Sequence, residues 1–218
     1  MLAIKTKHLS LYLFLLLSLL LFTINIYQSQ FFHWSAILDQ DIMIIYNSLL
    51  ISSGIEQEYR DHPGYTTFLI YGLLIKFFSL FNPDLLSNVN DLTKSLTPNK
   101  DLQTLFHFCR NINVIVNISL IFFLYKVLIK ITLNQTSAIL GCCILLVSSW
   151  YTESLFYLRN ENLSIIFFLI SFIFQIKFFE KRKFVFVVLS GIFFGIAMLT
   201  KIQIIFLFFF QLILIFIK

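Results

Sequence analysis

The stretch GYTTFLIYGLLIKFFSLF, residues 64–81, is one of several apolar runs in this 218-residue chain, and its placement decides how the chain crosses a membrane. Gly72, Lys76 and Ser79 interrupt it at i, i+4 and i+7, which draws a small and polar stripe down one helical face. Such a stripe is typical of a helix that lies in the membrane interface.

The composition of the whole chain indicates a membrane protein. Apolar residues make up 59% of the chain, charged residues only 12%, and phenylalanine alone occurs 28 times. A soluble domain of this length cannot hide so much apolar surface, and a disordered chain would be far more polar. The three cysteines have neither metal-ligand spacing nor a disulfide pattern. We therefore expect a polytopic α-helical membrane protein.

The other apolar runs predict the spans. The first, 9–27, follows Lys5 and Lys7, and no small-residue cleavage site comes after it, so we interpret it as a retained signal anchor. A long outer loop, 28–105, follows, with juxtamembrane helices at 41–53 and 64–81 and an irregular stretch at 82–104 that contains two of the three prolines. Further spans are expected at 106–131, 133–152, 163–179, 184–200 and 202–217.

Charge placement distinguishes two topologies. If residues 64–81 span the bilayer, two groups of basic residues in short loops, around Lys126 and around Lys181, fall on the outer side and violate the positive-inside rule. If residues 64–81 lie in the outer interface, nine basic residues and one acid, Glu180, face the cytoplasm, whereas seven basic residues and ten acids face outward. The second arrangement obeys the rule, so it is the one we predict.

The predicted fold is thus an all-α, polytopic membrane helix bundle of about six spans plus two interfacial helices in the first outer loop. Residues 1–218 form a single transmembrane module with a cytoplasmic N-terminus. The chain stops at Lys218, at the end of an apolar run, so we expect an N-terminal part of a longer protein.

The outer loop concentrates acidic residues. Asp39 and Asp41 come at the start of the first juxtamembrane helix, where a carboxylate caps free backbone N–H groups. Two carboxylates at this spacing can also act as a general base or hold a divalent cation. His62, before the second helix, is either a ligand or proton shuttle at the outer surface or a capping residue at headgroup level.

Three cations are expected on the same outer face as the aspartates. Arg110 opens the second span, Arg159 lies between the third and fourth with Glu161 close by, and Lys201 ends the fifth. Anchoring at the interface explains each cation separately. Their convergence on the aspartates is better explained by a site for a phosphate-bearing lipid and a hydroxyl acceptor, because cations at membrane depth usually meet an anion or a water-filled cavity.

These elements resemble the GT-C membrane glycosyltransferases, in particular the protein O-mannosyltransferases and the lipid A aminoarabinose transferase. The resemblance rests on several short motifs in order along the chain: Asp39-Gln40-Asp41-x4-Tyr46-Asn47-Ser48-Leu49-Leu50-x3-Gly54, Asp61-His62-Pro63-Gly64, Arg110, Arg159-Asn160-Glu161 and Leu199-Thr200-Lys201.

The resemblance implies a polyprenyl-phosphate sugar donor and a lipid, glycan or protein acceptor on the periplasmic, extracellular or lumenal side. A loop aspartate would deprotonate the acceptor, which attacks the anomeric carbon with inversion. The resemblance leaves two candidates for the base. The spacing to His62 favours Asp41 by comparison with the mannosyltransferases, and the spacing to Gly54 favours Asp39 by comparison with the aminoarabinose transferase. His62, Arg110, Arg159, Glu161 and Lys201 would bind substrate, with the cations on the leaving phosphate.

The competing interpretation is a non-catalytic membrane protein, such as a transporter component or a lipid-carrier binding subunit. A transporter is expected to have polar or broken helices near mid-membrane. Here the spans are nearly uninterrupted, apart from Asn113, Asn117 and the small-xxx-small pair Gly191 and Gly195, which indicates helix packing. Polar residues gather at the outer ends, which favours interfacial chemistry. No nucleic-acid partner is expected.

Overall fold

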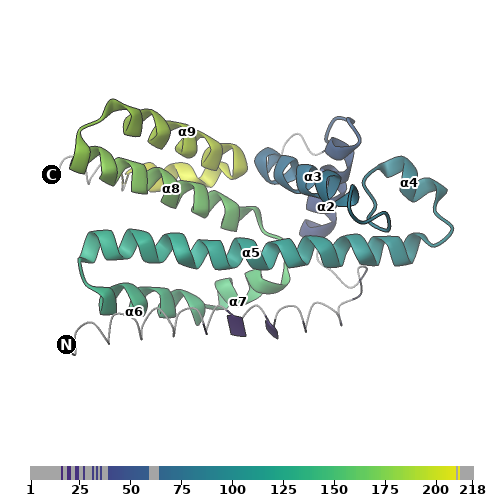
Figure 1. Ribbon diagram of the computed structural model, residues 1–218, viewed down its shortest axis with the longest axis horizontal. Helices are drawn as coiled ribbons and strands as arrows, with labels where there is room; N and C mark the ends of the chain where they lie inside the picture. Colours follow the sequence, from purple (N-terminus) through teal and green to yellow (C-terminus); the bar gives the residue numbers. More distant parts are fainter. Residues whose placement is uncertain are drawn as a thin grey trace.

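The computed structural model describes residues 39–58, 64–209 and 211, together with single positions between 16 and 35 (Figure 1). The described part of the chain is helical and contains no strand. Its elements are α2 (Asp39–Ser52), α3 (Tyr65–Ser79), α4 (Val89–Lys94), α5 (Pro98–Thr132), α6 (Gln135–Leu146), α7 (Ser149–Phe156), α8 (Asn160–Lys181), α9 (Phe184–Thr200) and the 3-10 turn η2 (Ile202–Ile204). Most of the expected span 9–27 and the end of the expected span 202–217 lie outside the described residues.

Helix α5 is the axis of the molecule. Its 35 residues correspond to a rod of about 50 Å. Helix α8 packs along its C-terminal half on one side and is covered in turn by α9, whereas α6 lies on the other side of α5 (Figure 1). Helices α2, α3 and α4 gather around its N-terminal half. One end of the molecule therefore contains the apolar helices α6, α8 and α9, and the other end contains the helices of the predicted outer loop, α2, α3 and α4.

Two described helices, α5 and α8, are long and apolar enough to cross a membrane. The pair α6 and α7 passes the same test jointly but is bent by 63°, so it adds a third candidate only if it counts as one broken span. Helices α2, α3 and α9 are apolar but shorter. The expected all-helical membrane fold is confirmed, whereas the expected count of about six spans is not reached among the described residues.

The N-terminal part of α5 differs from our expectation. The structure has α4 and the first turns of α5 within 82–104, the stretch that the sequence predicted to be irregular. Pro98 occupies the first turn of α5, where its missing N–H is harmless, and Asp101 follows in the same turn, where a negative charge is favourable. These turns are polar, so an apolar window does not detect them.

The expected span 133–152 is also interrupted. Helix α6 ends at Leu146, and α7 begins at Ser149 in a new direction. The hydroxyl of Ser148 accepts a hydrogen bond from the N–H of Tyr151 at 3.3 Å, which caps α7. An N-cap inside an apolar run thus starts a separate helix, and the chain that follows this helix leads to the candidate site.

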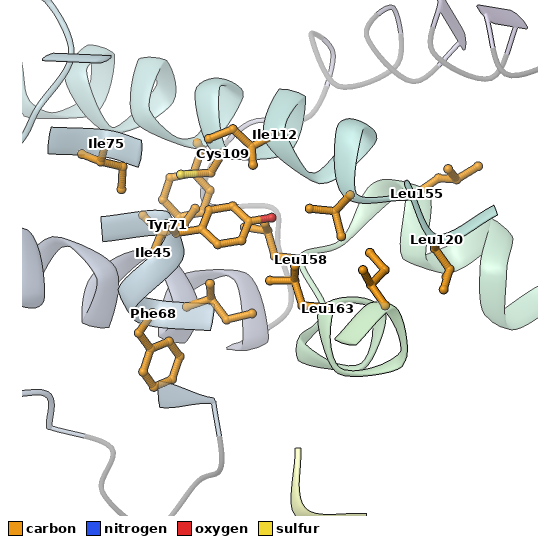
Figure 2. Close-up of a cluster of buried hydrophobic side chains, with 14 of the residues drawn as sticks. Ile45, Phe68, Tyr71, Ile75, Cys109, Ile112, Leu120, Leu155, Leu158 and Leu163 are labelled. Atoms are coloured by element: carbon orange, nitrogen blue, oxygen red, sulfur yellow. The ribbon is translucent and has the colours of Figure 1, made fainter. Parts of the chain in front are cut away.

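One buried core connects the loop helices to the bundle (Figure 2). Tyr71 of α3 lies beside Cys109 of α5, Phe68 lies further along α3 and away from Cys109, and Leu158 and Leu163 close the cluster from the α7–α8 region. All five are nearly or completely buried. This core fixes α2 and α3 against the α7–α8 loop, and the candidate site lies at that junction.

The predicted small and polar stripe of α3 is not exposed along its whole length. Lys76 is exposed, but Gly72 is buried against α2. A Cβ atom added at Gly72 would lie 2.7 Å from the backbone carbonyl oxygen of Ser48. Gly72 therefore serves the close approach of α2 and α3.

We expect Gly72→Ala to lower the stability of the protein in detergent by about 1–3 kcal/mol, because two backbones must move apart. Thermal unfolding monitored by tryptophan fluorescence measures this. Gly195→Ala is the matched control, since nothing lies within 4 Å of a Cβ added there and alanine favours a helix. Equal melting temperatures for the two variants would contradict the packing role of Gly72.

Candidate active site

Asp41 is the central residue of the candidate site. Its side chain, in the first turn of α2, is fully buried. Its Oδ1 accepts a hydrogen bond from the backbone N–H of Leu158 at 2.7 Å, and its Oδ2 is buried with no hydrogen-bond partner among the described residues. Burial raises the pKa of Asp41 to about 7, although the Leu158 N–H and the charges of Arg110 and Arg159 act in the opposite direction. A carboxyl that titrates near neutrality suits general acid–base work.

Two guanidinium groups approach Asp41 from different elements. Arg110 comes from α5, is buried, and places its guanidinium carbon 5.9 Å from the centroid of the Phe106 ring. Arg159 lies in the loop just before α8 and forms an ion pair with Glu153 at 3.2 Å. Both arginines interact electrostatically with Asp41. The structure thus brings together one carboxyl and two of the three predicted cations.

Lys201, the third predicted cation, is connected to Asp41 only through other charged residues. Its Nζ lies 2.8 Å from Oε1 of Glu161, which is in the first turn of α8. Glu161 also interacts electrostatically with Arg159. Arg159 therefore connects Asp41 to the Glu161–Lys201 ion pair, and the predicted residues form a continuous array of alternating charge.

Two of the predicted residues cannot be compared with the structure. His62 and the side chain of Asp39 lie outside the described residues. The adjacent Gly64 is described, and a Cβ added to it would lie 2.7 Å from Nδ2 of Asn160, the first residue of α8. Gly64, the residue before α3, therefore lies against the first residue of α8, which follows Arg159 in the chain.

The predicted metal site at Asp39 and Asp41 stays a prediction. Over the described ranges, no group of three or more histidine, cysteine or acidic residues is able to hold a metal ion. Asp41 contributes a buried carboxyl with one unpartnered oxygen, which is the chemistry that a divalent cation would need.

The sequence did not identify Tyr71 or the Leu158 N–H as parts of this site. Tyr71 of α3 is buried, interacts electrostatically with Asp41, and points its hydroxyl toward Leu158 (Figure 2). Burial raises the pKa of Tyr71 well above its ordinary value, so the hydroxyl stays neutral. The sequence does not indicate which backbone N–H will donate to a side chain. Tyr71 is one of many aromatic residues on apolar helices, so its position did not single it out.

Comparison with known proteins places this chain in a family. A sequence model described as dolichyl-phosphate-mannose-protein mannosyltransferase matches residues 105–218, slightly more than half of the chain. The matched part contains Arg110, Arg159, Glu161 and Lys201, whereas α2 with Asp41 precedes it. No curated protein and no solved structure matches the chain. The chain thus belongs to the dolichyl-phosphate-mannose-protein mannosyltransferase family, and the predicted GT-C type glycosyltransferase of the membrane is confirmed.

Proposed function

We propose that this chain transfers a sugar from a polyprenyl-phosphate donor to a hydroxyl or amine of a lipid, glycan or protein acceptor, with Asp41 as the general base. The observation that carries the proposal is the environment of Asp41: a buried carboxyl, anchored through Oδ1 and facing two guanidinium groups. Because Asp41 is buried, transfer requires that the acceptor displace the side chains that cover Oδ2.

The bond changes follow from this geometry. Oδ2 of Asp41 takes the proton of the acceptor hydroxyl while Oδ1 stays fixed by the Leu158 N–H. The acceptor oxygen forms a bond to the anomeric carbon, and the bond from that carbon to the phosphate oxygen breaks. The departing polyprenyl phosphate carries the negative charge, which Arg110 and Arg159 stabilise through charge-assisted hydrogen bonds.

The proposed orientation places this site on the outer side of the membrane. Basic residues gather at the opposite end of the bundle, where the end of α5 meets the end of α8 and Lys130 pairs with Glu180 at 2.7 Å. Positive charge favours the cytoplasmic side. Helix α3 exposes Leu73, Phe77 and, just beyond its end, Leu80, as expected for a helix that rests on lipid. The N-terminus is then cytoplasmic.

Retention of the carrier lipid tests the proposal. We expect Arg159→Ala to weaken the retention of undecaprenyl phosphate by about tenfold or more, because a hydrogen bond to a charged group contributes about 1.5–3 kcal/mol. Native mass spectrometry of the detergent-purified chain measures the bound fraction. Arg159→Lys should restore only part of it, since lysine lacks the bidentate geometry.

Lys181→Ala is the control, because Lys181 lies at the other end of α8. Uncharged polyprenol should be retained equally by the wild type and by Arg159→Ala. Equal retention of the phosphate by the wild type, Arg159→Ala and Arg110→Ala would refute the phosphate site. Normal retention without sugar transfer by the full-length protein would instead favour a non-catalytic lipid-carrier binding subunit.

A further inference from the structure

A cluster of buried polar side chains connects three helices next to the candidate site. Its members have side chains without a charge, and each is at most 1% exposed: Asn113, Asn117, Tyr151, Ser154 and Asn162. They come from α5, α7 and α8, two of which are candidate membrane spans. Polar groups at such depth are costly unless they are hydrogen-bonded, so a cluster of them requires an explanation. Within the cluster, Oδ1 of Asn162 is buried without a hydrogen-bond partner among the described residues.

Asn117 is the centre of the cluster. Its Nδ2 donates to the carbonyls of Asn113 at 2.9 Å and Ser154 at 3.0 Å. Its Oδ1 accepts from the Ser154 hydroxyl at 3.1 Å and from Nδ2 of Asn162 at 3.0 Å. Its backbone carbonyl accepts from the Tyr151 hydroxyl at 3.2 Å. One side chain of α5 thereby fixes both α7 and α8.

Asn113 extends the cluster to the site itself. Its Nδ2 donates to the carbonyl of Ser154 at 2.9 Å and to the carbonyl of Tyr157 at 3.1 Å. The Tyr157 carbonyl and the Leu158 N–H belong to the same planar peptide group. Asn113 therefore holds the oxygen side of the peptide whose N–H donates to Oδ1 of Asp41.

We infer that Asn113 and Asn117 are positioning residues for the reaction: they orient the Tyr157–Leu158 peptide so that its N–H fixes Asp41 and the next residue, Arg159, faces the same carboxyl. The inference rests on the proposed role of Asp41 as the base. A hydrogen bond to the carbonyl also polarises the peptide and strengthens its N–H as a donor. Helix packing alone does not require that Asn113 bond this particular peptide.

Titration of the Asp41 carboxyl tests the inference without donor or acceptor. The groups that face Asp41 are Arg110 and Cys109 from α5, Tyr71 from α3 and Arg159 from the loop. In Asn113→Ala these groups remain, but the Leu158 N–H is no longer held toward Asp41. Since that bond favours the charged carboxylate, its loss should move the titration midpoint upward by about one pH unit.

Infrared spectroscopy of protein with isotopically labelled aspartate measures this midpoint, with the spectrum of Asp41→Asn subtracted. Asn113→Ser is the milder variant, since its side chain is too short to reach the Tyr157 carbonyl yet stays polar, and it should move the midpoint in the same direction. Ser171→Ala is the control: it removes an equally buried hydroxyl that bonds the Ser190 carbonyl between α8 and α9.

An upward shift in both Asn113 variants and none in Ser171→Ala supports the inference. A midpoint equal to that of the wild type, accompanied by a lower melting temperature, would overturn it and leave the cluster as helix packing. The result stays distinct from that of the proposed function, because a protein that retains no polyprenyl phosphate still reports the titration of Asp41.

Discussion

Asp41→Asn is expected to lower the rate of sugar transfer by about a hundredfold or more, because the acceptor hydroxyl loses its general base. Asparagine has nearly the same shape, and its Oδ1 still accepts from the Leu158 N–H, so the site should keep its geometry. The initial rate of labelled mannose transfer from polyprenyl-phosphate mannose, measured in membranes that contain the full-length protein, gives the result. Retention of undecaprenyl phosphate should stay within about twofold of the wild type, since Arg110 and Arg159 remain.

Asp39→Asn is the comparison that assigns the base. If Asp41→Asn keeps the wild-type rate and Asp39→Asn loses it, the base is Asp39, and Asp41 only connects α2 to the α7–α8 loop. If both variants transfer normally, neither aspartate is catalytic. In the proposed assignment, kcat/KM of the wild type should rise with pH and level off above the pKa of about 7 of Asp41.

The sequence located most helices because their signal is local. Apolar runs predicted juxtamembrane helices at 41–53 and 64–81, and the structure has α2 and α3 at Asp39–Ser52 and Tyr65–Ser79. The predicted spans 163–179 and 184–200 lie within α8 and α9. The predictions of helix boundaries failed where a helix begins with polar residues and where an apolar run does not form one continuous helix. The first turns of α5 are polar yet helical, and the Ser148 cap breaks an apolar run.

The approach of the two arginines to Asp41 could be predicted from the sequence, whereas the hydrogen bonds around Asp41 could not. Positive and negative residues on one membrane face were expected to converge, and Arg110 and Arg159 do approach Asp41. The Leu158 N–H donates to Asp41, which lies more than a hundred residues earlier in the chain. This hydrogen bond depends on how the helices pack, and the sequence does not reveal that packing. Asn113 and Asn117, one helical turn apart in an apolar run, were the one available signal, since polar pairs at membrane depth usually have partners.

The second large effect concerns stability. The wild type should lose stability relative to Asp41→Asn as the pH rises from about 4 to about 7. The carboxyl has a folded pKa of about 7, against an ordinary value of 3.8. Between these values the unfolded chain has released the proton that the folded protein still holds, so folding is progressively disfavoured. Above pH 7 the penalty is constant and is about 4 kcal/mol, whereas asparagine does not titrate.

Melting temperatures of the two proteins in one detergent, measured at intervals from pH 4 to pH 8, test this expectation. The remaining acidic groups are common to both chains, so the difference between the curves isolates Asp41. Parallel curves would mean that Asp41 titrates like an exposed carboxyl, which would remove the case for a base tuned to neutrality. A widening gap up to pH 7 would mean that the fold holds an energetically unfavourable carboxylate above that pH. A carboxylate held in this way releases free energy when it takes a proton, and deprotonation of the acceptor uses that free energy.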